Sequence, residues 1–184
     1  MVSNIESMTK LFEERKFNIP KLVGISEKAI EVHLGLYSGY VKNVNELLQE
    51  KEYNRRFPFE FNGMRNHEVY FAHFEDGPQP FLSEGAFAKA GFDLEKFKTM
   101  ALTRGVGWAI VYYDPTSKQL INSWVDEHHL GQLVGLSPIL VLDMWEHAYF
   151  IDYTPAEKKK YIEAFFANLN WQNVEENFKT ANQE

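Results

Sequence analysis

The sequence contains no cysteine, no long apolar run and fewer basic than acidic side chains. Without cysteine there is no disulfide, no thiolate metal ligand and no nucleophilic thiol, so nitrogen and oxygen must hold any bound metal. The first 21 residues mix acidic and basic side chains and read as neither an export signal nor a membrane span, which favours the cytoplasm. Nineteen lysines and arginines against 26 acidic residues give a net charge of −7, which argues against a nucleic-acid partner.

What is present suffices for a core, because 45% of the 184 residues are hydrophobic. Hydrophobic residues recur every three or four positions after Ser26, a suitable N-cap, and predict a long helix with His33 in its apolar stripe. A second helix is predicted over about residues 62–74, with His67 on its inner side. His73 lies six residues after His67 and therefore points to a different face.

The clearest break in the chain is the turn-rich segment 76–80, Asp-Gly-Pro-Gln-Pro. It separates a predicted helical hairpin domain, residues 1–80, from a second domain, residues 81–184. The elements expected in the second domain are helices 83–90 and 93–103, strands 106–113, 120–125 and 138–142, and a last helix that begins at Thr154 with a capping box. This order predicts an α+β fold, in which a long-helix hairpin precedes a small three-stranded antiparallel sheet with helices.

Four side chains are candidate metal ligands. A single histidine on the apolar face of a helix is more often a hydrogen-bonded core residue than a metal ligand. Here, however, His33 and His67 lie on the inward faces of two separate predicted helices, which favours metal binding. Asp143 and His147 are four residues apart and converge if the local turn puts them on one side. Three imidazoles and one carboxylate suit redox iron or manganese, and also zinc. From spacing alone this set is a hypothesis.

The segment Asp143-Met144-Trp145-Glu146-His147-Ala148-Tyr149 resembles the D-x-W-E-H-A-Y signature of the iron/manganese superoxide dismutases, which is very specific. The similarity covers roughly residues 20–178 and includes these segments: the helix of His33 with Tyr40-Val41, Asn66-His67, Gly105-Val106-Gly107-Trp108 and Asn170-Trp171. The resemblance implies that the protein ligands of the metal are His33, His67, Asp143 and His147, with a solvent molecule as the fifth ligand.

The resemblance also implies a reaction and an assembly. Two superoxide anions give oxygen and hydrogen peroxide by one-electron cycling of iron, or of manganese. Trp108 and Trp145 are implied as shields of the metal. Glu146 is similar to the glutamate that reaches across a dimer to the partner's last histidine ligand, which favours a homodimer and leaves a tetramer open.

In this family a side chain near the metal-bound solvent tunes the metal, often a glutamine from one of two places. The first place, four residues before His67, is Gly63, which has no side chain for the task. Alignment back from Asp143 puts His128 at the other place, with His129 as a competitor if the loop shifts by one residue. A histidine there resembles the mycobacterial and archaeal subgroup, which is usually iron-dependent and sometimes active with either metal.

The chain departs from the family at several positions. Tyr40 resembles the tyrosine that gates substrate access, but it follows His33 by seven residues, one fewer than usual. Such a deletion rotates the following residues by ~100° unless it removes a helix bulge. Tyr37 and Phe150 stand where family members commonly pair a histidine with a tyrosine between subunits, and Thr154 ends a segment that lacks the usual basic residue.

Two other interpretations remain open at this point. One is a non-haem iron oxygenase built on two of the histidines and Asp143. The other is a helical interaction domain, or a family member with little or no activity, whose metal is structural. Binding of redox-inert zinc without any chemistry on superoxide would favour the second.

Overall fold

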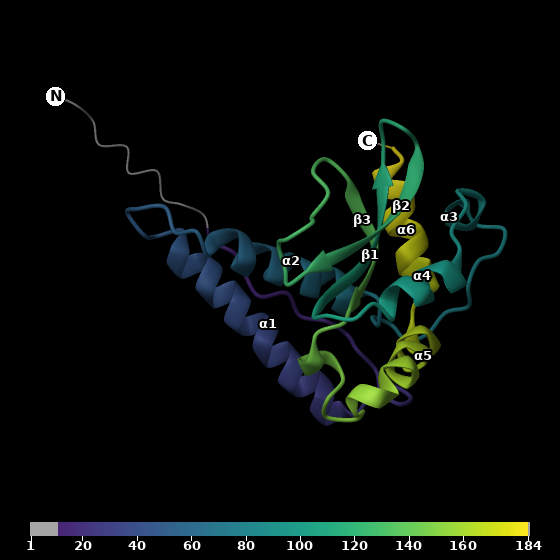
Figure 1. The fold of residues 1–184 in the computed structure, drawn as a ribbon, viewed down its shortest axis with the longest axis horizontal. Coiled ribbons are helices and arrows are strands. Elements are labelled where there is room, and N and C mark those ends of the chain that lie inside the picture. Colours follow the sequence, from purple (N-terminus) through teal and green to yellow (C-terminus); the bar gives the residue numbers. More distant parts are fainter. Residues whose placement is uncertain (1–10, 184) are drawn as a thin grey trace.

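Two long helices form a hairpin at the start of the fold (Figure 1). The computed structural model describes residues 11–183. Helix α1 (Glu27–Leu47) begins as predicted, because the Ser26 side chain accepts a hydrogen bond from the backbone N–H of Ala29. Helix α2 (Phe57–Ala72) begins five residues before the predicted start at 62, since a proline in its first turn has no N–H to lose there. Among residues 11–183 no helix is long and apolar enough to cross a membrane.

The second half of the chain contains a three-stranded antiparallel sheet in the order β2-β1-β3. The elements are α3 (Ala86–Lys89), α4 (Leu94–Ala101), β1 (Gly107–Asp114), β2 (Gln119–Asp126), β3 (Ser137–Asp143), the 3-10 turns η1 (Glu146–Ala148) and η2 (Pro155–Glu157), α5 (Lys158–Asn168) and α6 (Trp171–Ala181). The predicted α+β class and all three strands are confirmed. The helix expected over 83–90 is only one turn long, with Gly85 as its N-cap.

The predicted last helix is in fact two helices. The capping box at Thr154 and Glu157 is present, and it starts η2, which continues into α5. The chain then leaves the helical conformation at Leu169, and the side chain of Asn170 caps the N-terminus of α6 by accepting from the N–H of Gln172.

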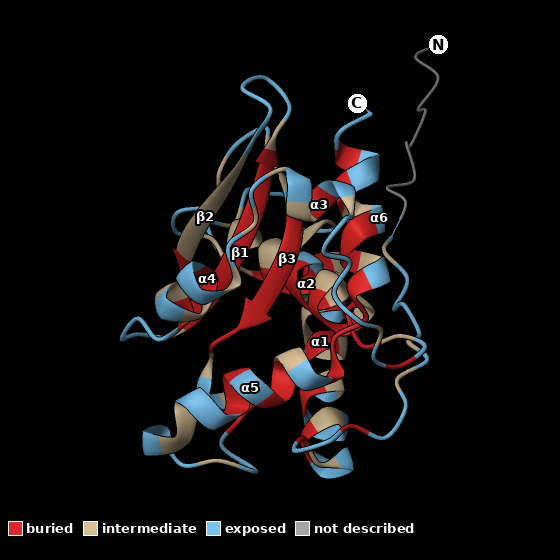
Figure 2. Ribbon diagram, turned by 90° about the vertical axis from the view of Figure 1, so that its right-hand side faces the viewer, coloured by how far each residue is buried: buried red, intermediate tan, exposed pale blue. Residues whose placement is uncertain are grey.

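The core lies between the sheet and the helices packed on it. Helices α2 and α6 contact β3, and α4 contacts β1 and β2. Figure 2 shows β1 and β3 buried along almost their whole length, whereas β2 is half-buried. The register of the sheet places Trp108 of β1 opposite Asp143, the last residue of β3. The sheet therefore carries two of the predicted site residues at one end, beside α2.

Residues 11–26, before α1, form no helix or strand and are held against the helices by hydrogen bonds. The backbone N–H of Phe12 donates to the side chain of Asn45, and the backbone N–H of Arg15 donates to the hydroxyl of Tyr37. Arg15 also pairs with Glu75, beyond the end of α2. The contact from Arg15 orients the hydroxyl of Tyr37.

Candidate metal centre

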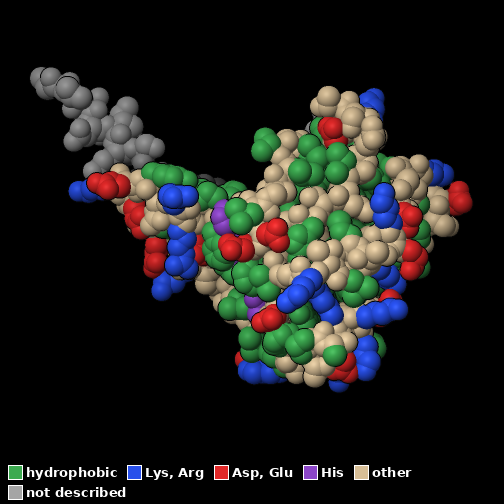
Figure 3. All heavy atoms as spheres, in the orientation of Figure 1, with side chains coloured by type: hydrophobic (Ala, Val, Ile, Leu, Met, Phe, Trp, Pro, Cys, Tyr) green, Lys and Arg blue, Asp and Glu red, His purple; other side chains and the backbone are tan. Residues whose placement is uncertain are grey.

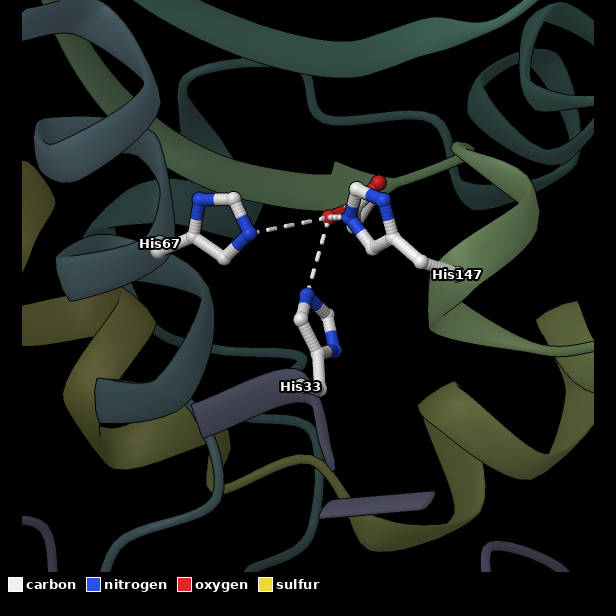
Figure 4. A group of neighbouring side chains, drawn as sticks. His33, His67 and His147 are labelled. Carbon is white, nitrogen blue, oxygen red and sulfur yellow. Dashed lines mark hydrogen bonds and ion pairs between the residues drawn. The ribbon is translucent and has the colours of Figure 1, made fainter. Parts of the chain in front are cut away.

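Four side chains from four elements meet in the interior. His33 comes from α1, His67 from α2, Asp143 from the end of β3 and His147 from η1. One ligand atom from each lies within 4.8 Å of all the others. Figure 4 shows the three imidazoles turned toward the same carboxylate oxygen. The structure thus brings together all four residues that the sequence predicted as ligands.

The carboxylate of Asp143 is fixed in orientation. Its Oδ1 accepts a hydrogen bond of 2.8 Å from the backbone N–H of Trp145. Its Oδ2 therefore faces the imidazoles, at 3.1 Å from Nε2 of His33, 3.2 Å from Nε2 of His147 and 3.6 Å from Nε2 of His67. Three nitrogen atoms and one oxygen atom consequently point at one small space.

His67 shows that this space suits a metal ion. Its Nδ1 lies 2.6 Å from the carbonyl oxygen of Gly63, one turn earlier in α2, and so must carry the proton. In the neutral ring Nε2 then holds a bare lone pair, directed at the group. That atom is buried and has no hydrogen-bond partner among residues 11–183. A lone pair that faces two imidazoles and a carboxylate fits a bound cation.

The electrostatics of the group agree with metal binding. Burial lowers the pKa of His33 and lowers the pKa of His67 further, so both rings are neutral near pH 7. Burial alone would raise the pKa of Asp143, but the adjacent His147 and His33 hold that pKa below its ordinary value. Neutral imidazoles and an ionised carboxylate are the protonation states that a metal ion requires.

Tyr40 faces the group because α1 is an unbroken α-helix from Glu27 to Leu47. Seven residues in a regular helix turn the chain through about 700°, only about 20° short of two full turns. Tyr40 therefore lies on the face of His33, and its ring packs 5.0 Å from the ring of His67. The short spacing is thus accommodated by a regular helix without a bulge.

The structure brings His128 to Tyr40 and leaves His129 aside. Nδ1 of His128 accepts a hydrogen bond of 2.9 Å from the indole N–H of Trp108, and its Nε2 lies 2.7 Å from the Tyr40 hydroxyl. His129 packs against Phe59, and its Nδ1 is 3.9 Å from a carboxylate oxygen of Glu127. The geometry favours the alignment that puts His128 beside the group.

These contacts fix the tautomer of His128. Indole nitrogen only donates, so Nδ1 carries no proton, and burial lowers the pKa of His128 to about 4, which keeps the ring neutral near pH 7. The proton therefore sits on Nε2 and is donated to the Tyr40 oxygen. Because Tyr40 accepts from His128, its own O–H remains available as a donor. Burial also raises the pKa of Tyr40, so that proton is retained at neutral pH.

The predicted tryptophans lie beside the ligands. The rings of Trp108 and His67 are nearly perpendicular, with their centroids 5.0 Å apart. The ring of Trp145 stacks on two histidines, with its centroid 5.6 Å from that of His147 and 4.8 Å from that of His128. Both indoles cover the imidazoles with apolar surface.

Two further predicted residues do not join the group. The hydroxyl of Tyr37 accepts from Arg15 and donates to Glu68 at 3.1 Å, on the side of α1 covered by the N-terminal segment. The family resemblance implied a place for Tyr37 near the ligands; its ring packs against Phe17 and Phe71, with ring centroids 5.7 Å and 6.3 Å apart. Glu146 lies next to His147 with its side chain exposed, and Phe150 is 42% exposed.

Sequence reasoning missed Phe59 and the full importance of Gly63. Phe59 packs 4.5 Å from the ring of His128 and 6.2 Å from that of Tyr40. A Cβ atom at Gly63 would lie 2.9 Å from the Tyr40 ring and 3.2 Å from His128. Phe59, Gly63 and His67 are spaced by four residues, so placing the start of α2 correctly would have put all three on one helix face.

A buried site of three imidazoles and one carboxylate, shared by a helical hairpin and the end of a small sheet, defines a mononuclear metalloprotein of the α+β class. Residues 85–177 match the family model described as iron/manganese superoxide dismutases, C-terminal domain. The chain is 34% identical to a protein of Aquifex aeolicus named superoxide dismutase (Fe), with 87% of each chain covered. It is 33% identical to a protein of that name from Cupriavidus metallidurans, covering 88% of this chain and 92% of the relative.

A third relative, from Aeropyrum pernix, is named superoxide dismutase (Mn/Fe) and is 28% identical over 81% of this chain and 80% of its own. The identity and coverage of the first two relatives establish the family. The chain belongs to the iron/manganese superoxide dismutases.

Proposed function

We propose that this protein is a superoxide dismutase whose metal is held by His33, His67, Asp143 and His147. The observation that carries the proposal is the convergence of these four donor atoms within 4.8 Å, with the lone pair of His67 Nε2 left without a protein partner among the described residues. The names of the relatives support the same activity. They do not favour an oxygenase or a purely structural metal.

When bound, the metal supplies the one-electron oxidation of one superoxide anion to oxygen and the one-electron reduction of a second to peroxide. The second half also needs two protons, because the product is hydrogen peroxide. Tyr40 is suited to deliver a proton, since its hydroxyl accepts from His128 and keeps its own O–H free. Trp108, Trp145 and Phe59 pack apolar surface against the histidines, and this low-dielectric surrounding strengthens the hydrogen bonds.

The metal proposed is iron, with manganese as the second choice. The ligand set suits both metals, and the relatives carry names with Fe, Mn or both. The argument for iron is His128, which stands where many family members have a glutamine; it accepts a hydrogen bond from Trp108 and donates one to Tyr40. Metal analysis of active protein distinguishes the two.

A homodimer, or a tetramer built from it, is part of the proposal. The exposed carboxylate of Glu146 adjoins His147, whose side chain is 20% exposed, so a second copy would place a carboxylate beside that imidazole. Figure 3 shows histidine atoms at the surface among hydrophobic and acidic side chains. The hydroxyl of Tyr37 is engaged within the chain, by Arg15 and Glu68. Light scattering of native protein and of Glu146→Ala tests this arrangement.

We also propose that the chain divides into two units near residue 80 and that the protein is located in the cytoplasm. The first unit supplies two histidine ligands and the second supplies Asp143 and His147, while Asp76 and Gly77 turn the chain between them with φ of 62° and 81°. The lack of cysteine suits a reducing compartment. Separate expression of residues 81–184 and fractionation of cells check these two points.

The decisive experiment is the superoxide dismutation rate of purified protein, normalised to the iron and manganese measured in the same sample. We expect activity that follows one metal at near one ion per chain. Protein that is folded and fully loaded with either metal, yet inactive, would contradict the proposal.

A further inference from the structure

The loop that carries His128 is held in a conformation that it would not adopt alone. Glu127, directly before His128, has a φ of 51°, in the left-handed region that residues other than glycine rarely occupy. Its backbone is tied on both sides: its N–H donates to the carbonyl of Val106, and its carbonyl accepts from the indole of Trp145. Such a conformation persists only when its surroundings fix it.

One side chain fastens the other end of this loop. The amide Nε2 of Gln132 donates to the carbonyl oxygen of His128 at 3.0 Å and to Oδ1 of Asn66 at 3.3 Å. Its Oε1 accepts from the hydroxyl of Tyr112 on β1. Gln132 thus joins three parts of the fold: the sheet, the His128 loop and helix α2 at the residue before His67.

We propose that Gln132 is a positioning residue of the active site, which acts through His128 by holding its Nε2–H on the Tyr40 hydroxyl. The proposal rests on the dismutase function above, because the Tyr40 proton matters only to a reaction that consumes protons. His128 is buried and its imidazole packs against the rings of Trp108 and Phe59, so a small shift of its backbone carbonyl moves the imidazole relative to both hydrogen-bond partners. Tyr112, by orienting the Gln132 amide, contributes to the same position.

Gln132 acts through the polar atoms of its amide and not only by filling space. Both oxygen and nitrogen of its amide are engaged, and its partners are a backbone carbonyl, an amide and a phenol. Methionine has the same length and fills similar volume without any strong donor, so Gln132→Met removes the bonds and keeps the packing. Asn177 provides a matched control, because it is half-buried and its amide donates to the carbonyl of Ile139 in β3, away from His128.

The test observes the Nε2 proton of His128 by nitrogen-15 NMR in the full chain loaded with zinc, a diamagnetic ion that accepts this ligand set. We expect solvent exchange of that proton to be roughly tenfold faster or more in Gln132→Met than in native protein, the factor expected for loss of one ordinary hydrogen bond. Asn177→Leu should leave the exchange rate unchanged. Tyr112→Phe removes the partner of the Gln132 amide oxygen but leaves the amide in place, so it should also make the exchange of the His128 proton faster. This variant tests the proposal if Gln132→Met does not fold.

An unchanged exchange rate in Gln132→Met overturns the proposal, as does an equal change in Asn177→Leu, which would indicate general loosening. The iron-loaded proteins separate this inference from the dismutase function. If native protein is inactive with iron but Gln132→Met still changes the exchange of the His128 proton, the dismutase function is contradicted and the positioning role stands. If native protein is active but Gln132→Met leaves that exchange unchanged, the function stands and the positioning role is contradicted.

Discussion

His73 should make the stability of this protein depend steeply on acidity. The side chain is fully buried at the end of α2, and its Nε2 accepts a hydrogen bond of 3.0 Å from the backbone N–H of Val141 in β3. Burial lowers its pKa from 6.5 to about 3, with no charged neighbour as a contributing cause. The folded chain therefore keeps His73 neutral at a pH where the unfolded chain already binds a proton.

The sign of the effect follows from that difference. A depressed histidine pKa in the folded state gives a contribution that is complete above the unfolded pKa of 6.5 and is lost as the pH falls toward about 3. Between pH 7.5 and pH 5, protonation of this residue in the unfolded chain lowers the free energy of unfolding by about 2 kcal/mol, at about 1.36 kcal/mol per pKa unit. The size of this decrease depends mainly on the pKa of His73 in the unfolded chain, so it is the same for any pKa in the folded chain well below 5.

The assay is denaturant unfolding of native protein and His73→Gln at pH 7.5 and pH 5, both metal-free in the presence of a chelator. Glutamine keeps an acceptor for Val141 N–H and does not titrate. Protonation of the ligand histidines affects both chains alike and cancels in the comparison. We expect the free energy of unfolding of native protein to fall by about 2 kcal/mol more than that of the variant. Parallel changes in the two proteins would refute the reasoning.

Three further predictions concern the metal centre. Gly63→Ala should retain metal but lose activity, because its Cβ would lie 2.9 Å from the ring of Tyr40; metal analysis alongside the rate assay checks this, and full activity would contradict it. Asp143→Ala should lose metal and activity together, since Asp143 faces three histidines; full metal occupancy would exclude it as a ligand. Trp108→Phe should keep the metal and lower the rate by roughly tenfold, because Nδ1 of His128 loses its hydrogen-bond donor and both tautomers of His128 become accessible. An NMR spectrum of the variant with only the Nε2–H tautomer of His128 would contradict this.

Much of the fold followed from local patterns. The three strands were placed within one residue of their observed ends, because β-branched and aromatic residues between turn signals carry the necessary information. The start of α2 was misplaced since Pro58 was not treated as a first-turn residue, and that error hid Phe59. The division between α5 and α6 was missed because an asparagine cap inside an amphipathic stretch is a weak signal.

The four metal-ligand candidates could be named from the sequence, because helix periodicity places His33 and His67 on inward faces and the family resemblance, carried by the signature with Asp143 and His147, implies the set. Their convergence on one carboxylate oxygen is a fact of tertiary structure. The same is true of the choice of His128 over its neighbour, since both histidines lie in a loop where side-chain direction has no period. Only the fold, by setting an indole on one side of His128 and a phenol on the other, decided which ring lies beside the metal ligands and which nitrogen carries its proton.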